Sequence, residues 1–295
     1  MRSELRYQES IRNIYADYVK PIIKSSRGLF GTITIVVMIL MATVGPEVVP
    51  LDLEPHPENM WCIPSLQHLF GCDYLGRDLF AMIIHGSREV FLIPFLASLI
   101  GVLIGVVLGL LGGFIGGLSR RIITALTDIW LTIPSFPAIF IMAYAFPKSY
   151  LTMVMILAVF SWPGLTRSII SEVSSLKTRD YVEAAVNLSL GRSHILFREI
   201  LPHLMPYIAY NLGALYVGNM TSLIGIIFLG VAPLNVTNWG YILNTMIYTY
   251  RALLIPQATP AILIILILLI YVKLGVVYFA QSLEEVFNPR LRVYE

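Results

Sequence analysis

Residues 180–202 read DYVEAAVNLSLGRSHILFREILP, a polar-rich segment that lies between strongly apolar ones. Asp180 and Glu183 have the spacing of a capping box at the start of a helix. Gly191 is expected to end that helix, and Ser193 to cap a second helix that runs to the end of the segment. The first helix places these residues on one apolar face: Tyr181, Ala184, Ala185 and Leu188. The segment therefore predicts an amphipathic helical hairpin suited to docking.

The composition around this hairpin is that of an integral membrane protein. The 295 residues are 57% hydrophobic and only 13% charged, and the mean hydropathy is +0.77. Several apolar runs exceed the roughly 18 residues that separate a spanning helix from a buried one. A soluble fold with a large core is therefore excluded, and the fold class is all-α and polytopic.

The apolar runs predict six transmembrane helices, at residues 28–46, 90–118, 122–146, 150–166, 205–229 and 256–279. With this topology, every Lys and Arg lies on one side except Arg77, Arg88, Lys148 and Arg251. The side rich in positive charge is the cytoplasmic one. We therefore expect a multi-pass protein of the cell membrane with the hairpin and both termini in the cytoplasm.

The topology divides the chain into four parts. They are a cytoplasmic N-terminal segment (1–28), a first span with an external loop (29–89), a transmembrane core (90–283) that contains the hairpin, and a cytoplasmic tail (284–295). Residues 230–255 are expected to form an external loop or a partly inserted turn, since they contain several turn-forming residues.

Cys62 and Cys72 lie in the predicted external loop, outside the reducing cytosol. They either form a disulfide that closes a small loop or remain free thiols, because sequence alone does not give their geometry. No group of His and Cys residues has zinc-site spacing, so no metal is expected.

Glycines recur every four residues along the second predicted span: Gly101, Gly105, Gly109, Gly113 and Gly117. Such a stripe lets another helix approach closely. Static close packing is the preferred interpretation, and a sliding or pore-lining face is the alternative. Asp128, in the third span, is either a functional carboxylate or one that reaches the membrane interface.

The sequence contains no phosphate-binding loop, no metalloprotease motif and no nucleophile elbow. Energy for transport would therefore come from a partner, whose motion a helix held between two spans can receive. An interfacial helix resting on lipid is the alternative for the hairpin. For the whole chain, the alternatives are a stand-alone secondary transporter or channel, and an intramembrane enzyme that uses Asp128.

The hairpin resembles the EAA loop of ABC importer permeases. Glu183, Ala184 and Ala185 match its Glu-Ala-Ala, and residues 200–202 match the apolar residue and Leu-Pro that follow. The family usually has a glycine six residues after the glutamate. This chain has Ser189 there, and Gly191 lies two residues further on.

A second segment resembles the dipeptide, oligopeptide and nickel permeases within that group. LFGCDYLGRD at residues 69–78 and HGSR at residues 85–88 are similar to the family segments that precede the second span. The matching residues are Asp73, Leu75, Gly76, Arg77, Asp78, Gly86 and Arg88, while Cys72 replaces the usual threonine. Trp239 with Gly240, and NPRLR at residues 288–292, also resemble later family segments.

The resemblance implies the C-type permease of a heterodimeric pair, which works with two ATP-binding subunits and an extracytoplasmic solute-binding protein. It implies no cofactor in this chain, since ATP and magnesium are bound by the partners, and no nucleic acid. Substrates would be peptides, or alternatively oligosaccharides or nickel complexes. The segment 73–88 would order the external mouth. The ATPase-coupling residues would be Asp180, Tyr181, Glu183, Ala184, Ala185, Ser189, Gly191, Leu201 and Pro202.

Overall fold

The computed structural model describes residues 20–231 and 234–287, and it confirms an all-α polytopic membrane protein. These residues form helices and one isolated β-bridge, between Cys72 and Asp78. The predictions made for residues 1–19 and 288–295, which include most of the N-terminal segment and the tail motif, lie outside the described residues.

The α-helices are α2 (Lys20–Lys24), α3 (Ser26–Thr43), α4 (Gly45–Val48), α5 (Leu79–Leu110), α6 (Gly117–Leu131), α7 (Ser135–Ala145), α8 (Tyr150–Leu176), α9 (Asp180–Asn187), α10 (Arg192–His194), α11 (Leu201–Phe228), α12 (Trp239–Asn244) and α13 (Thr259–Phe287). Three π-helical segments extend them: Leu111–Ile115, Ile195–Ile200 and Thr245–Thr249. Short 3₁₀ turns occupy Pro57–Asn59, Ala252–Leu254 and Pro256–Ala258.

Within the described residues, five continuous helical segments are long and apolar enough to cross a membrane, and a sixth arises if α6 and α7 form one broken span. The third predicted span is therefore not one helix. Its two halves bend by 77° at residues 132–134, where Pro134 precedes the first turn of α7. Because proline lacks the N–H that would continue the α-helical ladder, the helix breaks there.

The second and fourth spans are longer than the apolar runs predict. The second begins at Leu79 rather than at residue 90, because the Asp78 carboxylate accepts from the N–H of Ala81 and caps the helix. Gly86 and Arg88 therefore lie within α5 and not in the preceding loop. The fourth span passes through Pro163 and continues to Leu176, instead of ending near residue 166.

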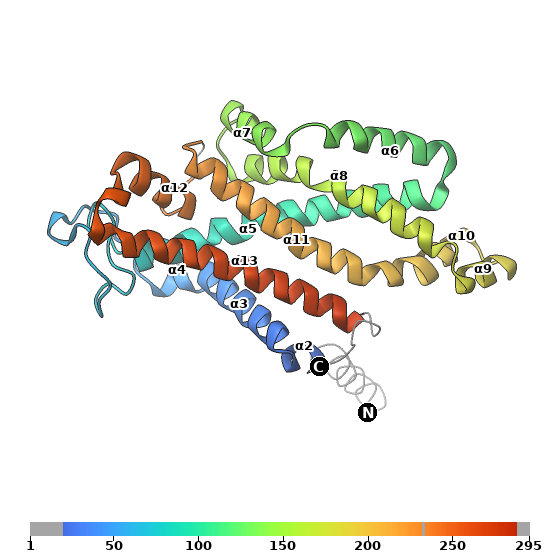
Figure 1. Ribbon diagram of the computed structural model, residues 1–295, viewed down its shortest axis with the longest axis horizontal. Coiled ribbons are helices and arrows are strands. Elements are labelled where there is room, and N and C mark those ends of the chain that lie inside the picture. The colour runs from blue at the N-terminus through green and yellow to red at the C-terminus, as the bar shows by residue number, and fades with distance from the viewer. Residues whose placement is uncertain (1–19, 232–233, 288–295) are drawn as a thin grey trace.

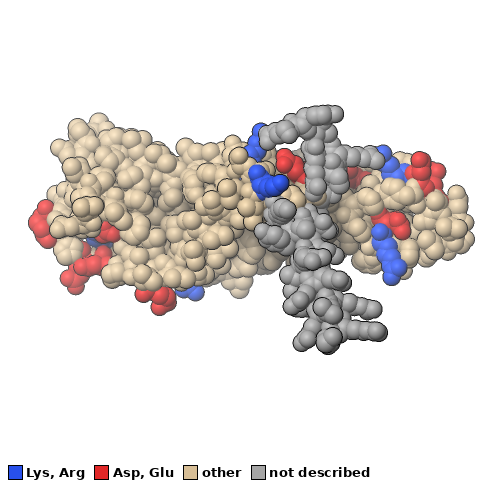
Figure 2. All heavy atoms as spheres, turned by 90° about the horizontal axis from the view of Figure 1, so that it is seen from below, with Lys and Arg blue, Asp and Glu red and all other residues tan. Residues whose placement is uncertain are grey.

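The spans run lengthwise through the molecule, and the two ends differ (Figure 1). The loop that precedes α5 lies with α4 and α12 at one end, which we call the loop end. The helices α9 and α10 lie at the other, which we call the α9 end. On the face seen in Figure 2, charged side chains gather near the loop end and again from the middle of the molecule toward the α9 end, and an uncharged stretch separates the two groups. This pattern fits helices that cross a bilayer.

The spans α5 and α8 pack closely along the glycine stripe. A Cβ built on Gly101 would lie 2.6 Å from the Ser161 Cβ, and one on Gly109 would lie 2.6 Å from the Ile169 Cβ. Gly105 and Gly113 face Leu165 and Val173 in the same way. The four glycines thus meet a row of α8 residues that has the same four-residue spacing, and the helices approach closely because α5 contributes no side chain at these positions.

Gly117, which continues the four-residue spacing, is not part of this contact. It has a positive φ of 56° and follows the break after the π-helical turn, and a Cβ built on it would meet nothing within 4 Å. Its assignment to helix packing is wrong, because the chain leaves the α5 axis at Gly116 and begins α6.

Residues 234–258 form a compact inserted turn rather than an exposed loop. Trp239, Ile242, Leu243 and Met246 are buried in a core shared with α3, α5, α11 and α13. The Trp239 indole N–H donates to the carbonyl of Ile83 over 3.0 Å. The segment therefore closes the loop end of the bundle.

The close contact of α5 and α8 predicts that a side chain added at Gly109 destabilises the fold, whereas one added at Gly164 does not. Gly109→Leu is expected to lower the free energy of unfolding by about 1–3 kcal/mol, because the side chain must be forced against Ile169. Gly164→Leu, on α8 where nothing lies within 4 Å of the Cβ position, is the matched control. Thermal unfolding in detergent measures both, and equal midpoints for the two variants would refute the packing role.

Candidate functional site

The helix α9 begins at Asp180, one residue earlier than a cap at Asp180 would require. Its N-cap is Arg179, whose side chain makes no capping hydrogen bond, and Asp180 and Glu183 lie in the first turn. The predicted capping box is therefore absent. The two carboxylates still stabilise the helix, because negative charge near a helix N-terminus interacts favourably with the helix dipole.

One face of α9 packs on the bundle and the other is exposed. Val182 and Ala185 are buried in a cluster with Ile195, Ile200 and Leu204. On the opposite face, Glu183 and Ala184 are exposed. The Glu-Ala-Ala sequence is thus divided, since its last residue anchors the helix and its first two face outward.

Tyr181 joins α9 to the start of α11. Its ring stacks on the His203 ring with centroids 4.8 Å apart, and partial burial raises the pKa of the Tyr181 hydroxyl above its usual value. Leu201 is half-buried and Pro202 is exposed in the first turn of α11.

The turn after α9 is formed at Ser189 and not at Gly191. Ser189 has a φ of +57°, in the left-handed region, whereas Gly191 has an ordinary φ of −60° and is the N-cap of α10. The N–H of Leu190 closes the turn by donating to the carbonyl of Ala185 over 3.1 Å. Ser189 therefore occupies the position at which the EAA loop of ABC importer permeases usually has glycine. Glycine adopts this conformation without strain.

The second arm of the predicted hairpin is not a separate helix. The chain is continuously helical over Arg192–Phe228, and Gly191, not Ser193, is its N-cap, without a side-chain hydrogen bond. Residues Ile195–Ile200 are π-helical just before Pro202, which has no N–H to continue an α-helical ladder. The structure therefore shows one short helix attached to a long span.

A groove of about 410 Å³ lies beside α9. It is lined by Phe114, Ile115, Lys177, Val182, Val186, Leu190, Arg192 and Ile195. The Lys177 ammonium donates to the carbonyl of Phe114 over 3.1 Å and so ties the end of α8 to the π-helical end of the second span. The α9 end therefore combines an exposed helix face, an apolar groove and cationic side chains.

At the loop end, the Asp73–Arg77 pair organises the turn before α5. One carboxylate oxygen of Asp73 accepts from the N–H groups of Leu75 and Arg77, each over 2.9 Å. The other accepts from the Arg77 Nε over 2.8 Å. Although burial of the guanidinium opposes its charge, the carboxylate raises the pKa of Arg77, so the guanidinium stays charged.

Gly76 is required by this turn. It has a φ of +78°, and a Cβ on it would lie 1.9 Å from the carbonyl oxygen of His56. The motif residues Asp73, Gly76 and Arg77 are buried, Leu75 is half-buried, and Arg88 is exposed on α5. The segment thus shapes the chain's own backbone at the loop end.

Cys62 and Cys72 form a disulfide in the same loop, with Cα atoms 4.9 Å apart. His68 lies near both sulfur atoms, and its Nδ1 is 3.1 Å from the Asp78 carboxylate. The disulfide uses both thiols, so these residues fasten the loop to the start of α5 and are not arranged as free metal ligands.

Sequence reasoning missed two polar networks. Glu89, which falls in the segment expected to be an external loop, is buried in α5 and accepts from Tyr150 over 2.9 Å and from Asn238 over 2.7 Å. In addition, a Cβ on Gly86 would lie 2.0 Å from the carbonyl oxygen of Thr237. The inserted turn and the start of α8 are therefore fixed to α5.

The second network lies within the spans. The Asn219 amide donates to Ser98 and accepts from Ser161, each over 2.9 Å, and all three residues are buried. These bonds connect α5, α8 and α11. The signal that could have found them is an asparagine inside an apolar run, since buried polar groups in membranes require partners.

Comparison with known proteins agrees with this architecture. Residues 101–293 match the family model described as binding-protein-dependent transport system inner membrane component. The chain belongs to this family. The oligopeptide transport system permease protein OppC of Bacillus subtilis is 30% identical over 72% of this chain and 70% of its own length.

Two further relatives of the permease have similar names. A probable peptide ABC transporter permease protein of Sinorhizobium fredii is 33% identical over 82% of this chain and 80% of its own length. A putative peptide permease of Brucella ovis is 28% identical over 61% of this chain, which spans 60% of that relative. The protein is thus a multi-pass permease of the peptide-permease type.

The backbone at Ser189 provides a test of the turn at the α9 end. Ser189→Gly is expected to stabilise the turn by about 1 kcal/mol, because glycine adopts a left-handed conformation without the steric cost of a Cβ. Amide hydrogen exchange over residues 185–195 should slow by about fivefold. Ser193→Gly, at a position with no positive φ, should not slow exchange, and equal effects of the two variants would contradict the assignment.

The buried ion pair provides a test at the loop end. Arg77→Met is expected to destabilise the loop by about 3–5 kcal/mol, because the fully buried Asp73 carboxylate loses its partner. Arg88→Met removes the same charge from an exposed position of α5 and is the control. Limited proteolysis between residues 50 and 78 measures the effect, and cleavage at the same rate in both variants would show that the pair does not hold the loop.

Proposed function

We propose that the permease is one half of the translocation path of an ATP-driven importer for peptides. It would pair with a second permease subunit, two ATP-binding subunits and an extracytoplasmic solute-binding protein. The names of its relatives and its family support this proposal. The observation that carries it is the geometry of α9, which is anchored through Val182 and Ala185 while Glu183 and Ala184 face outward.

An exposed helix of this kind suits the transfer of motion between subunits. The chain enters α9 from the long helix α8 and leaves it into the continuous helix that becomes α11. A rigid displacement of α9 would therefore act on two spans together. The exposed apolar side chains Val186, Leu188 and Phe197, which are 56%, 74% and 60% exposed, favour contact with a protein groove.

The proposed orientation places the α9 end and both termini in the cytoplasm. Residues 47–78 would then face the solute-binding protein. Because the motif residues Asp73 and Arg77 are buried there, contact would fall on the apolar side chains that the loop exposes: Met60, Ile63, Leu66 and Leu69. The chain itself would bind no cofactor, since ATP and magnesium would be held by the ATPase partners. Oligosaccharides and nickel complexes remain the alternative substrates.

Glu183→Arg is expected to abolish ATP-dependent peptide uptake in proteoliposomes that contain the complete transporter, while the subunits remain assembled. The substitution reverses charge on the exposed face of α9, where an ATPase groove would meet it, and leaves the buried anchors intact. Glu172→Arg, an exposed charge reversal near the end of α8, is the control.

Uptake by Glu183→Arg at the unaltered rate would disprove the role of this residue. Solute movement by the purified chain without ATP-binding subunits would instead favour a stand-alone transporter or channel. The intramembrane enzyme is disfavoured by the ion pair at Asp128, whose carboxylate lies 3.1 Å from the Arg167 guanidinium.

A further inference from the structure

An ion pair between α6 and α8 lies deep within the spans. The Arg167 Nη1 is 3.1 Å from the Asp128 carboxylate, and the two side chains are 63% and 47% exposed in this chain. Leu165 of α8 faces Gly105, which lies at the middle of the charge-free residues 90–118. Arg167 is two residues, or about 3 Å along the helix axis, from Leu165. The pair is therefore well inside the membrane-spanning region and not at its surface.

An exposed guanidinium at this depth does not suit contact with lipid. A charged side chain in hydrocarbon is costly, and such residues face the interior of a bundle or a water-filled cavity. The contact with Asp128 lacks the geometry of a hydrogen bond, since the Asp128 Oδ1 has no hydrogen-bond partner within the described residues. The Arg167 N–H donors are therefore available to water or to a solute.

The exposed surface of α8 changes from apolar to polar along the helix. Near the loop end, its exposed residues are aromatic or aliphatic: Tyr150, Leu151 and Met155. Between residues 164 and 171, its exposed residues are small or charged: Gly164, Arg167 and Ser171. The second set recurs every three or four residues, so its members share one face. A face in contact with lipid would be apolar along its whole length, so this part of α8 faces a polar environment.

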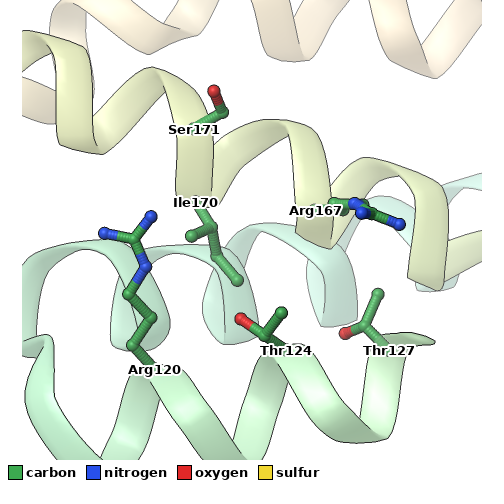
Figure 3. A pocket seen from close by; sticks show the side chains of 6 residues that line it. All are labelled: Arg120, Thr124, Thr127, Arg167, Ile170 and Ser171. Atoms are coloured by element: carbon green, nitrogen blue, oxygen red, sulfur yellow. The ribbon is translucent and has the colours of Figure 1, made fainter. Parts of the chain in front are cut away.

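The helix α6 has a polar side and an apolar side. Its polar side and α8 enclose a groove of about 200 Å³, lined by Arg120, Thr124, Thr127, Arg167, Ile170 and Ser171. In Figure 3, Arg167 lies near Thr127 at one end of the groove, and Arg120 lies at the other end. The opposite side of α6 exposes Ile122, Leu126 and Ile129. The groove therefore continues the polar surface from Arg167 toward the α9 end.

We propose that Arg167 lines the aqueous path of the permease and binds the carboxylate of a peptide that passes through it, while Asp128 positions the guanidinium. This role rests on the function proposed above, which supplies the peptide. A guanidinium matches the geometry of a carboxylate and can bind both of its oxygens at once. Every peptide with a free C-terminus has this group, so the contact serves peptides of different sequence.

Cysteine labelling of the complete transporter in open membrane fragments tests whether this face meets water. Gly164→Cys places a thiol on the face of Arg167, where nothing lies within 4 Å of the Cβ position. The control, Leu126→Cys, places one on the apolar side of α6, about 3 Å from Asp128 along the helix axis. A membrane-impermeant maleimide is expected to label Gly164→Cys about tenfold faster, because the thiolate that reacts forms in water. Equal rates in the two variants, or no labelling of Gly164→Cys, overturn the proposal.

ATP-dependent uptake by the complete transporter in proteoliposomes tests the carboxylate contact. Arg167→Gln is expected to lower the maximal uptake rate of a peptide with a free C-terminus by about tenfold, the effect of losing one charge-assisted hydrogen bond. Uptake of the same peptide as its C-terminal amide should change little. Because one solute-binding protein serves all variants, the ratio of peptide to amide uptake reports on Arg167 itself. Arg167→Lys keeps the charge and is expected to restore most of the wild-type ratio.

A structural defect would instead lower the uptake of peptide and amide equally, so an unchanged ratio in Arg167→Gln refutes the carboxylate contact. If that variant does not assemble, Asp128→Asn removes the positioning charge and is expected to lower the ratio, and a wild-type ratio in Asp128→Asn refutes the proposal. Failure of the proposed function gives a different result, because the wild type would then take up no peptide with ATP. The labelling of Gly164→Cys does not depend on uptake.

Discussion

The close approach of α5 and α8 is the constraint on which the rest of the structure depends. Four glycines on one helix face Ser161, Leu165, Ile169 and Val173 on the other, so only the α8 side chains stand between the two backbones there. In a bilayer, apolar surface is not driven together by water, so close van der Waals contact and interhelical hydrogen bonds must supply the association. The buried bonds from Asn219 to Ser98 and Ser161 add the third helix, α11, to this pair.

Both ends of the molecule are built on this three-helix unit. At the loop end, Glu89 and the carbonyl of Ile83, both on α5, accept hydrogen bonds from the inserted turn, and Glu89 also accepts one from the start of α8. At the other end, Val182 and Ala185 of α9 share a buried cluster with residues of α5, α8 and α11. The unit of α5, α8 and α11 therefore connects the two surfaces at which soluble partners would act. Its side chains are closely packed, so a displacement at one end is transmitted to the other rather than absorbed.

The sequence predicted the features that depend on composition and spacing. Long apolar runs indicated the spans, and the four-residue glycine spacing indicated a close helix contact. Features that depend on a local hydrogen bond or on distant contacts were not predictable. Hydropathy does not reveal that Asp78 caps α5, so the start of that helix was placed too late. Gly191 looked like the turn residue, yet the backbone places the positive φ at Ser189. Glu89 could not be identified as buried, because its partners Tyr150 and Asn238 are distant in sequence.

The break between α6 and α7 has a different consequence from the rigid contact of α5 and α8. A 77° bend leaves backbone polar groups at residues 132–134 outside a regular helical ladder. Such groups are tolerated at membrane depth only where protein or water surrounds them. Among the residues of α6 only Thr127 is buried within this chain, so the chain itself provides little cover for this region. A neighbouring molecule would therefore cover α6, whereas α5, α8 and α11 already share buried clusters with one another. A permease built in this way can keep α5, α8 and α11 fixed relative to one another while a neighbouring subunit covers α6.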